Sequence, residues 1–82
     1  MSEAIDSDLN HAASRLIKRQ RRVLGWAQDR LADECGLDRT YISAIERHRS
    51  NLSLTAMSKL LAALGLTIDD LADEVRRGVS DV

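Results

Sequence analysis

The stretch formed by residues 28–46, QDRLADECGLDRTYISAIE, constrains the fold more than any other part of the chain. Ala32 is small enough to let a second helix approach closely, and Gly36 can adopt the positive φ of a tight turn at little steric cost. Ile42 and Ile45 stand three positions apart, so they share one face of the following helix and can fill the angle between the two helices. The spacing therefore predicts two short helices joined by a turn, the geometry of a helix-turn-helix.

The composition favours an all-α fold around this stretch. The chain has 82 residues, four glycines and no proline, and a chain of this length forms one small domain that dimerisation would stabilise. Trp26 and Tyr41 are its only aromatic residues, so the core must be aliphatic. The single cysteine, Cys35, excludes an intrachain disulfide and suits a reducing compartment.

Capping residues and apolar residues at helical spacing predict five helices within a single domain over residues 8–78. Asp8 is expected to cap the first helix, and Gly25, Gly65 and Gly78 are expected to end helices. The acidic segment 1–7 is expected to be flexible, and residues 79–82 are expected to form a loose tail. The predicted helices cover residues 8–24, 28–35, 39–47, 54–64 and 68–77. The last of them is expected to carry Ile68, Leu71, Ala72 and Val75 on one apolar face.

The charge of the chain is unevenly distributed. The net charge is −1, which alone argues against a nucleic-acid partner, but residues 11–51 carry nine Lys or Arg against five acidic residues. The local field decides nucleic-acid binding, so this basic segment is compatible with DNA. The outer face of the first helix holds four of these cations, and both a solvated face and phosphate contact stay open for them. They are Arg15, Lys18, Arg19 and Arg22.

The first half of the third predicted helix carries side chains suited to base edges. Arg39 can pair with O6 and N7 of guanine, and the Thr40 methyl group can contact thymine. Tyr41 can offer its hydroxyl to a phosphate or its ring to a thymine methyl group, and Ser43 suits a phosphate or a base. A solvated surface is the alternative, which the surrounding turn pattern disfavours.

Residues on both sides of this helix are expected to hold the DNA backbone. Gln28 begins the second helix, where its amide and the free backbone N–H groups can meet a phosphate. Arg47, Arg49 and Asn51 lie in a basic loop that can grip the backbone beside the groove. The alternative for Gln28 is an ordinary helix-start residue.

Glu46 does not suit a surface that faces phosphates, because its carboxylate would repel them. We expect it to pair with Arg21 and so to fasten the first helix to the third. If the pair is partly buried, removal of one partner would strand the other charge.

Five aliphatic residues crowd the end of the fourth predicted helix and the fifth. They exceed what one small core absorbs, so we expect some of them to form a homodimer interface. The alternative is that all of them belong to the intramolecular core. The candidates are Leu64, Leu66, Ile68, Leu71 and Val75.

Residues 16–71 resemble the Cro/lambda-repressor-type (XRE) helix-turn-helix regulators. The resemblance rests on Ile17, Arg21, Gly25, Gln28, Leu31-Ala32, Gly36, the run LDRTYISAIER at 37–47, NLSL at 51–54 and LLAALGLTIDDL at 60–71. Within that family, LDRTYIS-IER together with Asn51 is similar to the small controller proteins of restriction–modification systems.

The resemblance implies a compact, five-helix, lambda-repressor-like protein that binds DNA as a homodimer. It implies phosphate contacts by Gln28 and Asn51 and base reading by residues 39–41 and 43. The chain departs from the family pattern at three positions. Ala27 stands where the family usually has a Ser or Thr cap. Gln20 occupies a position that is usually aliphatic, and Ser50 stands where controller-like members carry an arginine.

Together, sequence and resemblance predict a cytoplasmic, autoregulatory transcription regulator that binds double-stranded DNA as a homodimer. Its operator would be near-palindromic, with half-sites about one helical turn apart. The alternative is a DNA-binding antitoxin or a protein-interaction adaptor. The sequence has no Gly-rich phosphate loop, metal-ligand cluster or activated nucleophile, so we expect no enzyme activity, cofactor, metal or small-molecule ligand. Its longest apolar run, residues 60–64, predicts no membrane partner.

Overall fold

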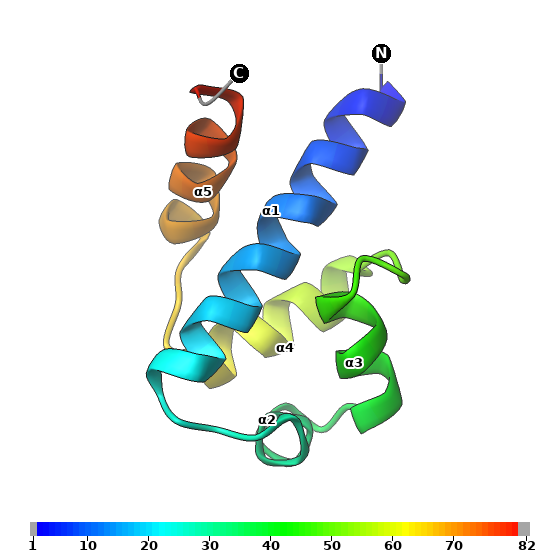
Figure 1. Ribbon diagram of the computed structural model, residues 1–82, viewed down its shortest axis with the longest axis vertical. Helices are drawn as coiled ribbons and strands as arrows, with labels where there is room; N and C mark the ends of the chain where they lie inside the picture. Colours follow the sequence, from blue (N-terminus) through cyan, green and yellow to red (C-terminus); the bar gives the residue numbers. More distant parts are fainter. Residues whose placement is uncertain (1, 81–82) are drawn as a thin grey trace.

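The computed structural model describes residues 2–80, with side chains over residues 9–78. In this part of the chain it contains five helices and no strand (Figure 1), which confirms the predicted all-α class. None of these helices combines the length and the apolar composition needed to cross a membrane. The helices are α1 (Ser2–Val23), α2 (Gln28–Cys35), α3 (Arg39–Glu46), α4 (Leu54–Leu64) and α5 (Ile68–Ser80).

Side-chain caps and left-handed glycines set most of the helix ends where the sequence predicts them. Asp38 accepts a hydrogen bond from the backbone N–H two residues later, and Ser53 accepts one from the N–H three residues later. Thr67 and Asp70 exchange the hydrogen bonds of a capping box at the start of α5. Gly36 follows α2 with φ 71°, which a residue with a Cβ rarely adopts.

α1 is longer than predicted. It begins at Ser2 rather than at Asp8, and residues 2–8 contain no glycine or proline that would end a helix. Its C-terminal end is near the predicted one, since Val23 is the last helical residue and Gly25 follows with φ 73°.

α5 also extends past its predicted end, and Gly78 does not stop it. A Cβ built on Gly78 would lie 2.8 Å from the Nη2 atom of Arg15. The glycine therefore makes room for an arginine of α1 and does not act as a helix terminator. Residues 81–82 of the predicted tail lie outside the described residues.

The aliphatic core lies where α1 packs against α3 and α4, with α2 closing the lower end (Figure 1). Ile17, Leu31, Ile42, Ile45 and Leu60 are fully buried there. Because the two isoleucines of α3 and the leucine of α2 share this core, the angle between α2 and α3 is filled as the sequence predicts.

Two polar features near the core explain residues that are unusual in the sequence. Gln20, where the family resemblance implies an aliphatic residue, donates its amide to the carbonyl oxygen of Leu64 at 3.3 Å. That bond satisfies a carbonyl at the C-terminal end of α4. Ala27 makes no side-chain cap for α2, as its sequence position predicts.

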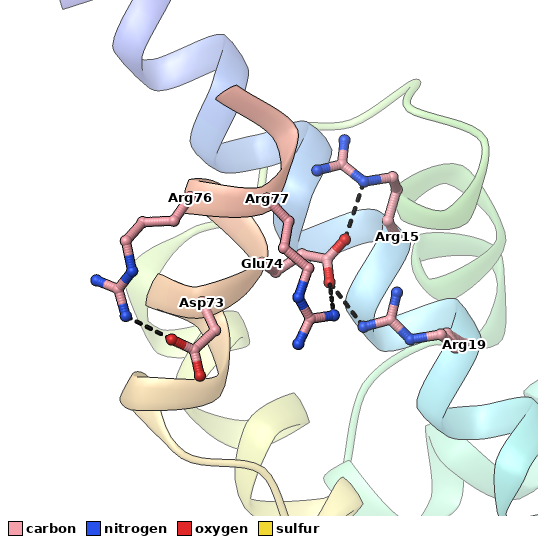
Figure 2. A network of polar contacts seen from close by, with 6 residues as sticks. All are labelled: Arg15, Arg19, Asp73, Glu74, Arg76 and Arg77. Atoms are coloured by element: carbon pink, nitrogen blue, oxygen red, sulfur yellow. Dashed lines mark hydrogen bonds and ion pairs between the residues drawn. The ribbon is translucent and has the colours of Figure 1, made fainter. Parts of the chain in front are cut away.

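Glu74 attaches α5 to α1 (Figure 2). Glu74 is 5% exposed, and its carboxylate accepts hydrogen bonds from Arg19 Nη2 at 2.6 Å and Arg15 Nε at 3.1 Å. These bonds, foremost the one from Arg19, hold the pKa of Glu74 below its usual range despite burial. Arg77 adds a third, longer contact at 3.8 Å.

The buried face of α5 therefore differs from the predicted one. The sequence interpretation placed Ile68 and Val75 on the apolar face together with Leu71. Leu71 and Glu74 are buried, whereas Ile68 is 67% exposed and Val75 is half-buried. The helix is rotated relative to the prediction because the Glu74 carboxylate turns toward the arginines of α1.

Candidate nucleic-acid interface

α2, the turn at Gly36 and α3 form a helix-turn-helix. The turn is closed by backbone hydrogen bonds from Gly36 and Leu37 to the carbonyl oxygen of Ala32, the second of them 3.1 Å long. Asp38 then caps α3 by accepting from the N–H of Thr40 at 3.0 Å. The first turn of α3 is thus held at a fixed position relative to α2.

The predicted ion pair between Arg21 and Glu46 is present and is almost inaccessible to water. Arg21 donates from Nε to Glu46 Oε2 at 2.7 Å and from Nη2 to Oε1 at 2.8 Å. The side chains are 12% and 2% exposed. Burial alone would raise the pKa of Glu46, but the hydrogen bonds from Arg21 and Gln28 outweigh it and leave that pKa below its usual range.

Gln28 takes part in the same network, which the sequence did not predict. Its amide nitrogen donates to Glu46 Oε1 at 3.1 Å. An amide nitrogen carries two hydrogens, so one remains for a phosphate at the N-terminal end of α2. The Glu46 carboxylate therefore joins side chains from α1, α2 and α3.

The expected base-reading side chains divide into exposed and half-buried ones. Arg39 and Thr40 are exposed on the first turn of α3, and Ser43 is half-buried one turn later. Arg39 is also held within the motif, because its Nε lies 3.1 Å from Oδ1 of Asp29 on α2.

Tyr41 is placed differently from the prediction in one respect. Its ring packs against the core, and its hydroxyl donates to the carbonyl oxygen of Asn51 at 3.2 Å. The hydroxyl oxygen of Tyr41 in turn accepts a hydrogen bond from the N–H of Ser53 at 3.4 Å. Because its one hydrogen is used, the hydroxyl in this arrangement is not a donor for a phosphate, and the ring is the part left for a base.

The loop after α3 carries Arg47, Arg49 and Asn51, all of them exposed. The Nε atom of Arg47 folds back to donate to the carbonyl oxygen of Ser43 at 3.3 Å. His48 has φ 59°, uncommon for a residue with a side chain.

Two contacts hold this loop against α1. The ring of His48 meets the ring of His11 edge-on with their centroids 4.8 Å apart. The backbone N–H of Leu52 donates to the side-chain oxygen of Asn10 at 3.0 Å. The loop that carries the basic side chains is therefore anchored at both ends.

Comparison with known proteins identifies the family. The model of a family described as helix-turn-helix, HTH_3, matches residues 17–71, which include α2, the turn, α3 and α4. The chain belongs to this helix-turn-helix family.

Curated relatives of this helix-turn-helix protein include regulators. It is 57% identical to a Neisseria hypothetical transcription factor from Neisseria meningitidis over 42 residues, 51% of this chain and 40% of the relative. It is 51% identical to Control protein C.BamHI of Bacillus amyloliquefaciens over 47 residues, 57% of this chain and 58% of the relative. The chain thus spans about half the length of these two relatives.

A solved structure matches a larger share of both chains. It is the tetramer of the restriction-modification controller protein C.Esp1396I in complex with its natural 35 base-pair operator. The likeness has a TM-score of 0.74 at 34% identity and covers 82% of this chain and 93% of that one. The resemblance to controller proteins inferred from the sequence is therefore confirmed.

The dimer candidates separate into buried and accessible residues. Leu64 and Leu71 are 2% and 5% exposed within the helix-turn-helix protein's own core. The prediction that they form an interface is corrected to the intramolecular alternative, because contacts within the chain already cover them. Leu66 and Val75 are half-buried, and Ile68 is 67% exposed, so these three can face a partner.

Asp29 and Glu74 were not among the predicted site residues. Glu74 stands three positions after Leu71 and so shares its face, which was an available signal for burial. Asp29 lies across the turn from Arg39, and an acidic residue in the first turn of a helix is common for reasons of helix stability alone. Its contact with Arg39 depends on the angle between α2 and α3, which the sequence does not specify.

Proposed function

We propose that this protein is a sequence-specific transcription regulator that binds double-stranded DNA as a homodimer, with α3 in the major groove. One observation carries the proposal: α3 has one face fully buried through Ile42 and Ile45, while its first turn exposes Arg39 and Thr40. A helix held from behind and exposed at its N-terminal turn is the arrangement that presents side chains to base edges.

The residues of the interface have two roles in this proposal. Arg39 contacts guanine, Thr40 and the ring of Tyr41 contact thymine methyl groups, and Ser43 makes an adaptable contact. The backbone contacts position α3 without reading sequence. They come from Gln28, Arg47, Arg49 and Asn51.

The dimer places two copies of α3 in successive major grooves, about 34 Å apart, so the operator is near-palindromic. Ile68 supports this part of the proposal, since an exposed isoleucine at the start of α5 would lose solvent contact in a dimer. Leu66 and Val75, which are half-buried, are the other candidates for this surface. The tetramer of C.Esp1396I on its operator supports binding of more than one dimer at adjacent sites.

Similarity to control proteins favours an autoregulatory role, in which the protein binds upstream of its own gene. The control function is part of the names of those relatives, and for this chain it is a proposal. The proposal also includes a cytoplasmic location and the absence of catalytic activity. A DNA-binding antitoxin is the second candidate, which an acidic C-terminal third favours; residues 52–82 hold five acidic residues and three basic ones.

Selection of bound duplexes from a random DNA pool tests the proposal. The purified protein is expected to enrich a near-palindromic sequence, and the Arg39→Ala variant is expected to enrich one that has lost a guanine in each half-site. Enrichment of no sequence by the unaltered protein would overturn the proposal. Co-purification of a toxic neighbour that blocks DNA binding would favour the antitoxin.

A further inference from the structure

Arg39 is held before any DNA is bound. Its Nε lies 3.1 Å from Oδ1 of Asp29, and the two side chains come from the two helices of the helix-turn-helix. Their side chains are 57% and 78% exposed, so neither is fixed by burial. Among the residues that the structure describes, the ion pair with Asp29 limits where the Arg39 guanidinium can lie.

We propose that Asp29 is a positioning residue for base recognition, which holds the Arg39 guanidinium in the orientation that reads guanine. The inference rests on the proposed function and deepens it, because it names a specificity-determining residue that makes no contact with a base. This indirect role of Asp29 differs from the direct DNA contacts proposed above, all of which are made by hydrogen-bond donors or by apolar groups.

The chemistry of the guanidinium fits this role. An arginine has five N–H groups, one on Nε and four on the two terminal nitrogens. The Asp29 carboxylate lies beside the Nε group, so both terminal nitrogens are left to meet O6 and N7 of guanine together. A flexible arginine loses rotamer freedom when it binds, and a carboxylate that orders it beforehand reduces that loss.

Asp29 is otherwise unfavourable at this position. It lies in the first turn of α2, beside the N-terminus that is expected to meet a phosphate, and a carboxylate there repels DNA. Its removal therefore has two opposite effects if the proposal is right. Affinity for every sequence rises because a negative charge is lost, whereas discrimination at the guanine falls because Arg39 is no longer oriented.

Asp33 provides the matched control. It lies on the same helix, four residues later, is exposed, and forms no ion pair among the described residues. Asp33→Ala removes the same charge from α2 without touching Arg39. Any effect that comes only from the net charge of α2 will appear in both Asp33→Ala and Asp29→Ala.

The experiment measures the affinity of the full chain for three duplexes at one salt concentration. They are the selected operator, the operator with the Arg39-dependent guanine pair replaced, and a shuffled duplex. We expect Asp29→Ala to lower discrimination at that pair about fivefold, the amount an exposed ion pair can contribute, while Asp33→Ala leaves it unchanged. Asp29→Glu is expected to restore part of the discrimination, and in an Arg39→Ala background Asp29→Ala is expected to change it no further.

Three results would overturn the inference. The first is that Asp29→Ala and Asp33→Ala discriminate equally well at the guanine pair, and the second is that Asp29→Ala loses discrimination at every operator position. The third is that Asp29→Ala lowers discrimination as much in the Arg39→Ala background as it does in the unaltered protein. The second would show that Asp29 shapes α3 as a whole. Failure of the unaltered protein to prefer its operator over the shuffled duplex would instead contradict the proposed function, so the two failures are distinguishable.

Discussion

Arg21 and Glu46 form a buried, two-bonded ion pair that joins α1 to the C-terminal end of α3. The guanidinium also donates from Nη1 to the carbonyl oxygen of Trp26 at 2.7 Å, and Gln28 adds its amide to the carboxylate. The end of α3 that carries Glu46 is therefore fixed to the body of the protein, while the opposite end presents Arg39 and Thr40.

The first prediction concerns the stability that depends on this pair. Arg21→Ala strands the Glu46 carboxylate in a site where it is 4% exposed, so we expect a loss of about 3–5 kcal/mol in the free energy of unfolding. Urea denaturation followed by circular dichroism measures it. Glu34→Ala is the control, because it breaks an exposed pair with Arg30 that contributes at most about 1 kcal/mol. Equal losses in the two variants would contradict the structural role of Glu46.

The second prediction concerns acid. Hydrogen bonds from arginines lower the pKa values of Glu46 and Glu74 in the folded protein, so their stabilisation is present above the unfolded-state pKa, about 4.3. It is lost as the pH falls below that value toward the folded-state pKa values. Glu74→Gln should therefore be less stable than the unaltered protein at pH 7 and lose less stability on acidification. Urea denaturation from pH 7 to pH 3 measures both slopes, and identical slopes would argue against the pairing of Glu74.

The third prediction separates base reading from backbone binding. Arg39→Ala should cost about 1–3 kcal/mol against the operator and little against a shuffled duplex. Asn51→Ala should weaken binding to both duplexes by a similar factor, since a phosphate contact carries no sequence information. Fluorescence anisotropy at fixed salt measures these affinities. Equal losses for Arg39→Ala on both duplexes would make it a phosphate contact.

The fourth prediction tests the dimer surface. Ile68→Glu places a charge on the exposed start of α5, so we expect a shift from dimer to monomer in sedimentation analysis without loss of helical content. Val23→Glu is the control, because Val23 is 71% exposed at the end of α1, outside the proposed surface. A dimer that withstands Ile68→Glu, or that Val23→Glu dissociates equally, would place the interface elsewhere.

Local signals predicted much of this structure. Gly36, the Asp38 cap and the Ile42–Ile45 spacing act within a few residues, so the sequence alone located α2 and α3. The Arg21–Glu46 pair followed from a physical conflict, an acid beside a surface expected to bind phosphate.

Contacts that depend on the angles between helices were not predictable. The Asp29–Arg39 and Glu74–Arg15 contacts join residues on different helices. The burial of Glu74 had a local signal, but the partner of each carboxylate did not. The same limit explains α5, whose buried face was assigned from apolar residues alone. The hydrogen bonds of the Tyr41 hydroxyl join it to the segment between α3 and α4, whose path the local sequence does not specify.

The central claim is that α3 reads a DNA sequence from a homodimer. The most direct test is an equilibrium titration of the full chain with its selected operator and with a shuffled duplex of equal length and composition, near physiological salt. We predict that the operator binds on the order of 10³-fold more tightly or more, with two chains per near-palindromic site. Equal affinities for the two duplexes would contradict the account.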